Sequence, residues 1–302
     1  MRALVTGATG FIGGQLAAVL GKRGHDVRCL VRDRSRAERL ANQGFELHEG
    51  DVLEAESLRG AGNGVEIAYY LVHSMGRGSD REGFMERERR AAATFARMAK
   101  DEGVARVVYL GGLGERPESQ HLRSRAETAA VLRRDGPPLT YFRASMVIGA
   151  ESASYRVVRY LVERLPAMIA PAWLRNRTQP IAAQDVFQYL AQAAELPASE
   201  GREVQIGGPD VLTYSQVLDQ MATVLGVRRR PQLPVPLLSA KLSSHWIGLV
   251  TPVDTGVAKP IVESLVTDTV VVDPAGMELF DIQPLGLAEA LRRAHADELR
   301  GS

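Results

Sequence analysis

Short apolar runs and helical repeats alternate along the first half of this chain. The apolar runs indicate strands near residues 2–6, 27–31, 45–48, 66–72, 106–110 and 140–143. The repeats between them indicate helices near residues 11–23, 35–42, 80–101 and 119–134. Strands that alternate with helices are typical of a parallel sheet with helices on both faces. The pattern therefore predicts an α/β fold with a doubly wound parallel sheet.

The pattern is less regular in the second half of the chain. It indicates helices near residues 155–165 and 183–196 and a strand near residues 203–206. Thr213 and Gln216 match a capping box, which predicts that another helix begins there. Residues 228–260 are rich in proline and small residues and have little periodicity, so we assign them to the substrate side.

A glycine-rich turn, Gly7-Ala8-Thr9-Gly10-Phe11-Ile12-Gly13, follows the first strand and begins the first helix. The first glycine permits a tight turn, the second lets a pyrophosphate approach the backbone, and the third lets the helix pack closely on the sheet. Backbone N–H groups at a helix start also favour the negative charge of phosphates. The turn therefore predicts a dinucleotide site formed by Gly7, Thr9, Gly10, Phe11, Ile12 and Gly13.

With Thr6 included, the turn reads TGxxGxxG and resembles the opening motif of the extended and atypical short-chain dehydrogenase/reductase superfamily. The segments LVRD, GDV, LVHSM, HLRSR, FRASMVIGA and IGGPDVLTY resemble the atypical, NmrA-like branch, over roughly residues 1–225. The resemblance implies a Rossmann fold that binds NAD(P). The branch includes both reductases and proteins that bind NADP without turning it over.

This resemblance also gives a domain interpretation. We expect residues 1–150 to form the NAD(P)-binding Rossmann domain. Residues 151–302 would form mainly a smaller substrate-capping region, with residues 181–206 returning to the Rossmann core.

Arg32 is the residue from which we predict the cofactor. It follows Gly13 by 19 residues, close to where a residue that contacts the adenosine ribose belongs. An arginine there can pair with the 2′-phosphate of NADP, so we expect NADP, with NAD the less favoured cofactor. Two alternatives stay open: Asp33 as the ribose ligand of NAD, or Arg32 as one member of a solvated basic cluster.

Further cofactor contacts are expected where the third and fourth strands end. The superfamily resemblance implies that Asp51 and Val52 contact the adenine. Val72, His73 and Ser74 follow the fourth strand, where the cofactor passes from ribose to nicotinamide. His73 could touch cofactor or substrate, or could be a histidine that is hydrogen-bonded at a strand end.

The Ser and Tyr-x-x-x-Lys residues that the superfamily uses for carbonyl chemistry are missing. Gly111 and Gly112 occupy the serine position, and His121 and Arg125 stand at the tyrosine and lysine positions. Histidine titrates near neutrality, so His121 is a candidate proton donor. Arg125 could hold the nicotinamide ribose, and Tyr155 is a second candidate donor. The alternative is a helix face that binds the cofactor without catalysis.

Composition narrows the function further. The net charge of +1 favours neither nucleic acid nor an anionic membrane as a partner, and the single cysteine, Cys29, excludes a cysteine metal site. We find no apolar run long enough to span a membrane and no signal peptide, so we expect a cytoplasmic protein.

We interpret the chain as an NADP-dependent oxidoreductase that reduces a small, largely apolar carbonyl, quinone or conjugated alkene. The alternative is a non-catalytic NADP(H)-binding regulatory or assembly protein.

Overall fold

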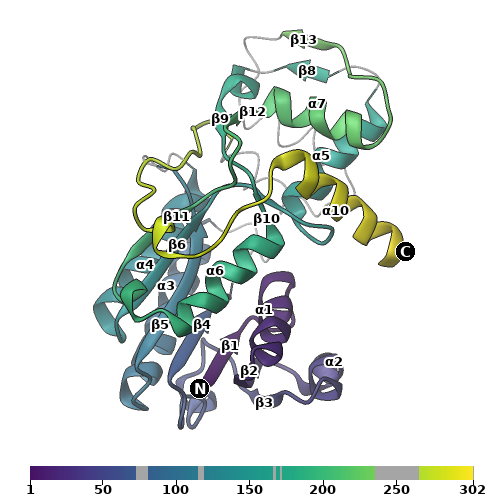
Figure 1. The fold of residues 1–302 in the computed structure, drawn as a ribbon. Coiled ribbons are helices and arrows are strands. Elements are labelled where there is room, and N and C mark those ends of the chain that lie inside the picture. The colour runs from purple at the N-terminus through teal and green to yellow at the C-terminus, as the bar shows by residue number, and fades with distance from the viewer. Residues whose placement is uncertain (73–80, 115–118, 166–167, 171, 235–264, 302) are drawn as a thin grey trace.

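The computed structural model describes residues 1–72, 81–114, 119–165, 168–170, 172–234 and 265–301. Its larger part contains a seven-stranded sheet in the order β11-β6-β5-β4-β1-β2-β3, with every neighbouring pair parallel (Figure 1). The strands are β1 (Arg2–Thr6), β2 (Asp26–Val31), β3 (Glu46–Glu49), β4 (Ile67–Tyr70), β5 (Arg106–Gly112), β6 (Leu139–Ala144) and β11 (Glu203–Ile206). The predicted doubly wound α/β fold is confirmed.

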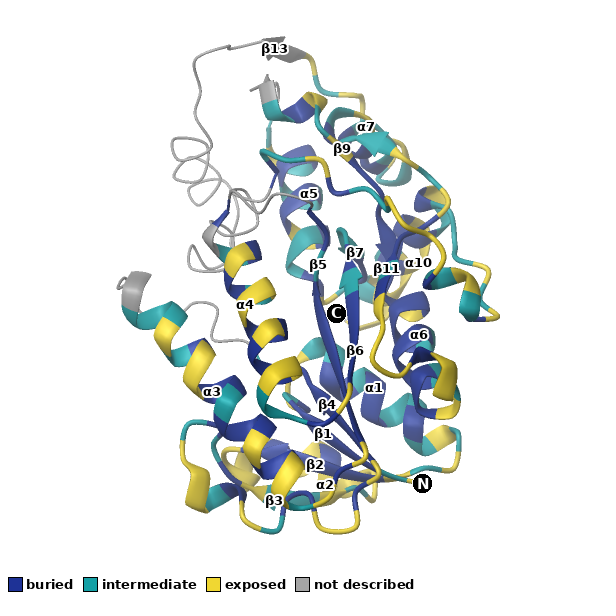
Figure 2. Cartoon of the chain, turned by 90° about the vertical axis from the view of Figure 1, so that its left-hand side faces the viewer, coloured by how far each residue is buried: buried dark blue, intermediate teal, exposed yellow. Residues whose placement is uncertain are grey.

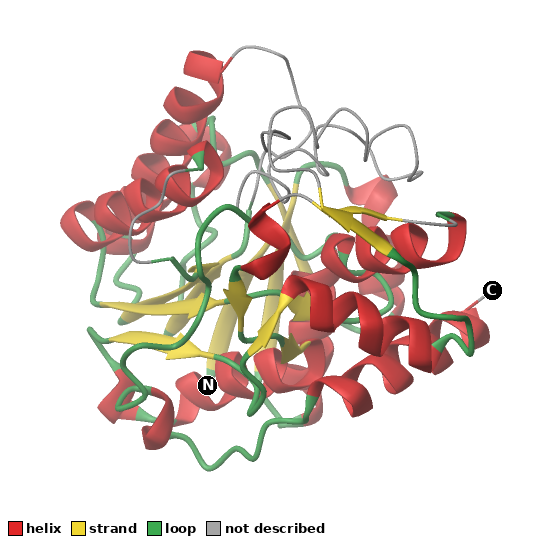
Figure 3. Cartoon of the chain, turned by 90° about the horizontal axis from the view of Figure 1, so that it is seen from above, coloured by secondary structure: helices red, strands yellow, loops and turns green. Residues whose placement is uncertain are grey.

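Helices cover both faces of this sheet, as Figures 1 and 3 show. One face carries α1 (Phe11–Lys22) and α6 (Ala183–Glu195), and the other carries α3 (Arg81–Asp101) and α4 (Gln120–Asp135). Successive residues of a strand point to opposite faces, so Val5 packs with α1 and α6 while Leu4 packs with α3 and α4. Because both faces are covered, the strands are buried almost throughout (Figure 2).

The strand order reverses between β1 and β4. From β1 the chain builds outward through β2 and β3, and it then crosses back to add β4, β5 and β6 on the other side. At such a reversal the loops at the carboxyl ends of the strands diverge and leave a crevice, which is where open α/β sheets bind ligands. The topology therefore places the glycine turn, which follows β1, at the mouth of that crevice.

A smaller layer lies beyond the carboxyl edge of the sheet. Its helices are α5 (Ala153–Arg164), α7 (Tyr214–Val224) and α10 (Leu287–Gly301), which share one apolar core. Its strands form short pairs: β7 (Val147–Ile148) with β10 (Ile181–Ala182), β9 (Arg177–Thr178) with β12 (Leu212–Thr213), and β8 (Met168–Ala170) with β13 (Gln232–Pro234). The predicted capping box is confirmed, because Thr213 accepts from the Gln216 N–H and Gln216 accepts from the Thr213 N–H.

Several predicted segments differ in detail. The helix predicted at residues 35–42 is a 3₁₀ turn (Arg34–Ala37) followed by the short helix α2 (Glu38–Asn42), and further 3₁₀ turns occur elsewhere. Helix α10 was not predicted. Most of the irregular segment at residues 228–260 lies outside the described residues, and the domain boundary at residue 150 stays a prediction.

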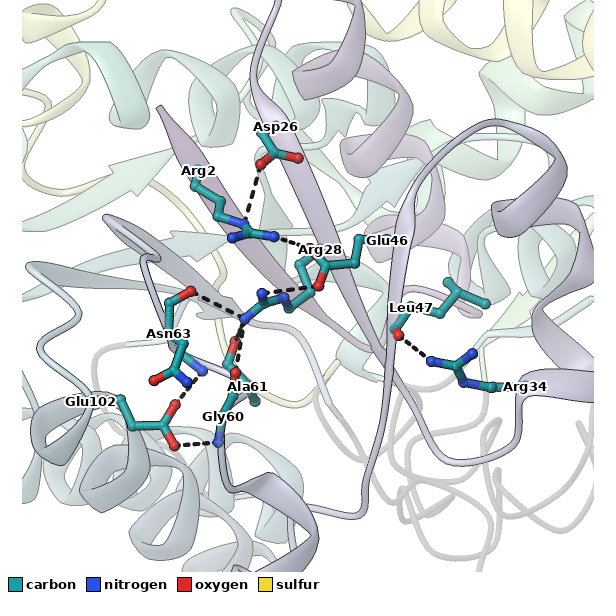
Figure 4. Close-up of polar contacts among 11 residues, drawn as sticks. Arg2, Asp26, Arg28, Arg34, Glu46, Leu47, Gly60, Ala61, Asn63 and Glu102 are labelled. Carbon is teal, nitrogen blue, oxygen red and sulfur yellow. Dashed lines mark hydrogen bonds and ion pairs between the residues drawn. The ribbon is translucent and has the colours of Figure 1, made fainter.

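A buried arginine connects β2, β3 and the loop before β4 at the end of the sheet opposite the crevice (Figure 4). Arg28, on β2, donates to the carbonyl oxygens of Gly60 (2.9 Å), Ala61 (2.7 Å) and Asn63 (3.3 Å). It also pairs with Glu46 on β3 at 2.9 Å. These contacts fix the loop before β4 against β2 and β3, whose other ends carry Arg32 and Asp51.

Candidate cofactor and substrate site

A cavity of about 860 Å³ runs along the carboxyl edge of the sheet. Residues that follow or end six strands line it: Gly7, Thr9 to Gly13, Leu30 to Arg32, Gly50 to Leu53, Leu71, Val72, Leu110 to Leu113 and Ala144 to Val147. Helices and loops add Arg87, Ala91, His121, Leu122, Arg125, Glu151 to Ser154, Tyr214, Leu265 and Thr269. The cavity thus extends from the β2–β3 side, past the glycine turn, to the smaller layer beyond β6.

The glycine turn has the geometry that phosphate binding requires. Gly7 has a φ of +66°, and a Cβ there would lie 2.5 Å from the Leu71 carbonyl oxygen. A Cβ on Gly13 would fall on the carbonyl group of Gly7. Gly10 is the N-cap of α1 and offers no side-chain cap, and the first turn of the helix has no acidic residue. The N–H groups at the start of α1 are therefore left for an anionic ligand.

Arg32 and Asp33 lie in different surroundings at the end of β2. Arg32 is exposed and lines the cavity. The Asp33 carboxylate accepts from the backbone N–H (2.9 Å) and the hydroxyl (2.6 Å) of Ser35, and these bonds lower its pKa. Asp33 thus caps the 3₁₀ turn and is not among the lining residues. This placement favours Arg32 over Asp33 as the ribose-side residue, which stays a prediction.

The structure describes some of the other predicted cofactor contacts and leaves others outside the described residues. Asp51, Val52 and Val72 line the same cavity. The Asp51 carboxylate accepts from the Leu53 N–H at 2.9 Å, which orients the loop after β3. His73 and Ser74 lie outside the described residues.

His121 and Arg125 occupy one face of α4, one turn apart, and both line the cavity. Arg125 Nη1 donates to the Leu110 carbonyl oxygen at 3.0 Å, which holds the guanidinium against the end of β5. Burial, and then the positive charge of Arg125, lower the pKa of His121 to about 3. The imidazole is therefore neutral at physiological pH and has no extra proton to give. His121 lines the cavity as a neutral imidazole, and its role as the proton donor stays a prediction.

The lowered His121 pKa makes stability depend on pH. The folded value, about 3, lies below the unfolded value of 6.5, so the unfolded chain binds more protons between them. Stability is thus lost as pH falls through 6.5. Each pKa unit corresponds to about 1.4 kcal/mol, so we expect about 2 kcal/mol of this loss between pH 7 and pH 5.

His121→Gln isolates this contribution, because glutamine does not titrate. Urea unfolding at pH 7 and pH 5 would give the loss in stability for each protein. The wild type should lose about 2 kcal/mol more than the variant over this interval. Equal losses would mean that His121 keeps an ordinary pKa in the folded chain.

The structure leaves no room for the missing serine. A Cβ on Gly111 would lie 2.7 Å from the Tyr141 hydroxyl oxygen, and one on Gly112 would lie 2.5 Å from Leu122 Cδ2. Tyr141 is buried and stacks on Tyr109 with ring centroids 5.4 Å apart, so it cannot move aside easily. The end of β5 is therefore shaped for glycine.

Tyr155 does not reach the cavity. Its side chain is 0% exposed in the core of α5, α7 and α10, and its hydroxyl donates to the Glu298 carboxylate at 3.1 Å. Burial, followed by the negative charge of Glu298, raises the Tyr155 pKa. We therefore correct the expectation that Tyr155 donates a proton: it links α5 to α10.

Ser145, Tyr214 and Thr269 line the cavity and were not predicted as site residues. Ser145 directly follows β6, so the rule that sites lie at the carboxyl ends of strands could have found it. Tyr214 ends the segment IGGPDVLTY, which could have marked it, whereas no local pattern marks Thr269. Among the described residues there is no group of three or more metal-ligating side chains, and none of the described helices could span a membrane.

The sheet order, the glycine turn and the crevice define a Rossmann-type protein. The NmrA-like family model matches residues 1–243, most of the chain, so the chain belongs to the NmrA-like family. The resemblance seen in the sequence is thereby confirmed.

Curated relatives of the chain include enzymes and an assembly factor. It is 30% identical to (4-alkanoyl-5-oxo-2,5-dihydrofuran-3-yl)methyl phosphate reductase of Streptomyces griseus, covering 74% of this chain and 73% of that protein. It is 24% identical to NAD(P)H azoreductase of Xenophilus azovorans, covering 82% and 81%. It is 22% identical to photosystem II assembly factor Ycf39 of Trieres chinensis, covering 82% and 76%. A shorter match, 33% identical, covers 38% of this chain and 35% of sterol demethylase protein B of Methylococcus capsulatus.

A solved structure supports the fold over its whole length. NADPH-dependent quinone oxidoreductase QOR2 of Escherichia coli, complexed with NADPH, superposes with a TM-score of 0.75 at 21% identity. The match covers 98% of this chain and 100% of that one.

Proposed function

We propose that the chain is an NADPH-dependent reductase of a small, largely apolar carbonyl, quinone or conjugated alkene. The observation that carries the proposal is that one cavity joins the glycine turn to the end of the crevice beyond β6. A cofactor whose phosphates bind at the turn would reach a substrate at that far end. The reductase and azoreductase relatives, which match most of this chain, support the same class of reaction.

The described residues fit the cofactor. A Cβ on Gly10 would meet only the Gly7 carbonyl oxygen, at 3.2 Å, so the space on the cavity side is open for a pyrophosphate. We assign the pyrophosphate to the N–H groups at the start of α1, the adenine to Asp51 and Val52, and the 2′-phosphate to Arg32. Arg125 would hold the nicotinamide ribose. When bound, the reduced nicotinamide supplies a hydride.

The walls beyond β5 and β6 suit an apolar substrate. Leu113, Met146, Val147 and Leu265 line this part of the cavity, and the lining also has polar groups from Ser145, Glu151, Ser152, Ser154, Tyr214 and Thr269. Arg125, the nearby cation, is held by the Leu110 carbonyl group. Apolar walls with few polar groups are typical of sites for small apolar ligands.

A panel assay tests the proposed activity. NADPH absorbance would be followed with 1,4-naphthoquinone, 2-cyclohexenone, benzaldehyde and, as a polar comparison, a nucleotide sugar. We expect oxidation of NADPH with at least one of the three apolar acceptors and none with the nucleotide sugar. If the protein binds NADPH but no acceptor oxidises it, the proposed activity is wrong.

The second candidate is a non-catalytic NADP(H)-binding regulatory or assembly protein. The loss of the Ser and Tyr-x-x-x-Lys residues and the likeness to an assembly factor favour it. Under this reading NADPH would bind tightly and stay reduced with every acceptor of the panel.

Arg32→Ala tests the cofactor preference. If Arg32 pairs with the 2′-phosphate, the variant should lose about 1.5–3 kcal/mol of NADPH binding, which is roughly a 10- to 150-fold rise in Kd. Its NADH affinity should hardly change, because NADH has no 2′-phosphate. Fluorescence titration with each cofactor would measure both values.

Arg34→Ala is the matched control for Arg32→Ala. Arg34 donates to the Leu47 carbonyl oxygen at 2.7 Å and is not among the lining residues, so its loss should spare both affinities. Equal losses of NADPH and NADH binding in Arg32→Ala would show that Arg32 stacks or supports the loop instead.

A further inference from the structure

Four hydroxyl groups from separate segments meet beyond the end of β6. Ser145 Oγ lies 2.8 Å from Thr178 Oγ1 and 3.0 Å from Thr269 Oγ1. Thr269 Oγ1 donates to Thr178 Oγ1 at 3.0 Å and lies 3.2 Å from the Tyr214 hydroxyl oxygen. We call Ser145, Thr178, Tyr214 and Thr269 the hydroxyl cluster.

The hydroxyl cluster is buried and held by its backbone. Thr178, Thr269 and Tyr214 are 0%, 6% and 5% exposed. The Thr269 N–H donates to the Arg177 carbonyl oxygen (2.9 Å) and the Gln179 N–H to the Thr269 carbonyl oxygen (3.0 Å), which fixes Thr269 beside Thr178. The Tyr214 ring packs edge-on against Trp173 with centroids 6.4 Å apart.

Three members of the cluster line the far end of the cavity: Ser145, Tyr214 and Thr269. Thr178 stands behind them and does not line it. Their neighbours on the wall, Met146, Val147 and Leu265, are apolar. A polar spot on an apolar wall is the arrangement that orients a small ligand by its polar atom.

The hydroxyl cluster can donate a hydrogen bond to an acceptor atom in the cavity, and its hydroxyl groups are uncharged. Each hydroxyl has one proton to donate, so at most four hydrogen bonds can form within the cluster at one time. An acceptor atom that enters the cavity can take one of these protons in place of an internal contact. Burial raises the pKa of Tyr214, although hydrogen bonds with Thr269 and Thr178 oppose the shift, so the phenol stays protonated at neutral pH.

We propose that the hydroxyl cluster is the proton-donating subsite for a neutral substrate oxygen, with Tyr214 as the acid. This inference rests on the proposed reductase function. It gives the reaction a donor on α7, in a different part of the fold from the α4 position of the superfamily's tyrosine. Ser145 and Thr269 orient the substrate oxygen beside the phenol, and Thr178 positions both from behind.

The step balances for a carbonyl acceptor. The hydride forms a C–H bond at the carbonyl carbon, and the C=O π electrons move to the oxygen. That oxygen takes the proton of the Tyr214 hydroxyl, which becomes a phenolate. Water entering the cavity reprotonates the phenolate, so one NADPH and one solvent proton give the alcohol and NADP⁺. A phenol is a stronger acid than an alcohol, so the proton transfer runs downhill.

Tyr214→Phe tests the donor, because it removes the hydroxyl and keeps the ring packed on Trp173. With the best carbonyl or quinone acceptor of the panel, we expect kcat to fall about 100-fold or more. The Kd for NADPH and the urea midpoint should stay close to wild type. Thr178→Val should lower kcat less, and Thr178→Ser, which keeps a hydroxyl, should restore turnover to within about threefold of wild type.

A binding measurement separates this inference from the proposed function. With NADP⁺ bound, no hydride transfer occurs, and the C=O stretch of ¹³C-labelled benzaldehyde reports hydrogen bonding at its oxygen. The stretch should shift to lower frequency in the wild type and lose part of this shift in Tyr214→Phe. If the wild type is active and Tyr214→Phe is equally active, or if the C=O stretch does not shift in an active wild type, the inference is wrong. The reductase function would stay intact. If no acceptor of the panel oxidises NADPH but the C=O stretch still shifts in the wild type, both the reductase function and the acid role of Tyr214 are wrong. The cluster would then be a binding subsite.

Discussion

Gly10→Asp should abolish NADPH binding and leave the chain folded. We expect Kd to rise about 100-fold or more, because a carboxylate would stand where the pyrophosphate must approach the start of α1. Folding should survive. The Gly10 backbone is extended, with φ −90° and ψ 171°, and an added Cβ meets only the Gly7 carbonyl oxygen, at 3.2 Å. Aspartate is also a favourable N-cap for α1.

Two neighbouring substitutions separate charge from size in this experiment. Gly10→Asn has the same size as Gly10→Asp without its charge, and Gly10→Ala adds only the Cβ. Fluorescence titration should rank NADPH affinity as wild type, Ala, Asn and Asp, in falling order. Full affinity in a folded Gly10→Asp protein would show that the phosphates do not bind at this turn.

Arg28→Met should strongly destabilise the fold at a position outside the site. The Arg28 side chain is 7% exposed, and it serves three carbonyl oxygens and the Glu46 carboxylate. Methionine fills much of the space but leaves the carbonyl oxygens of Ala61 and Asn63 without the Arg28 donor, whereas Glu46 keeps its pair with Arg2 and the Gly60 oxygen keeps the Asn63 N–H. Leaving a buried acceptor unpaired costs about 1–3 kcal/mol, so two such oxygens lead us to expect a loss of about 3 kcal/mol in unfolding free energy.

Arg34→Met is the control for Arg28→Met, and Figure 4 shows both arginines. The Arg34 side chain is 61% exposed and donates to one carbonyl oxygen, that of Leu47. Its loss should cost under about 1 kcal/mol. Urea unfolding of both variants measures the difference, and similar losses would mean that the buried contacts of Arg28 add little.

The sequence predicted the elements whose pattern is local. The strands of the main sheet and its four large helices have apolar repeats that extend over four residues or more. The short pairs such as β7 with β10 have two residues each, too few for a repeat, and they form because distant segments meet. Helix α10 is a different case: Leu287, Ala290, Leu291 and Ala294 form its buried face at helical spacing, which is a local signal for a helix.

The same distinction applies to the site. The glycine turn is a local motif, so its residues could be placed from the sequence alone. The charge state of His121 depends on burial and on Arg125, which only the folded chain reveals. Tyr155 has a helical neighbourhood that does not show which way its ring points. The hydroxyl cluster joins residues up to 124 positions apart, so no sequence pattern could have marked it.

The packing at Gly111 and Gly112 bears on how this chain could change over time. A serine at position 111 would collide with Tyr141, which is buried and stacked on Tyr109, whereas at position 112 it would meet only the end of the Leu122 side chain. Gly111→Ser alone would therefore lower stability without giving a correctly placed hydroxyl. Tyr141 would have to give way first, and α4 would also need a tyrosine and a lysine where it now has His121 and Arg125. Several coupled substitutions thus separate this chain from the superfamily's triad, whereas the hydroxyl groups of the cavity are already in place.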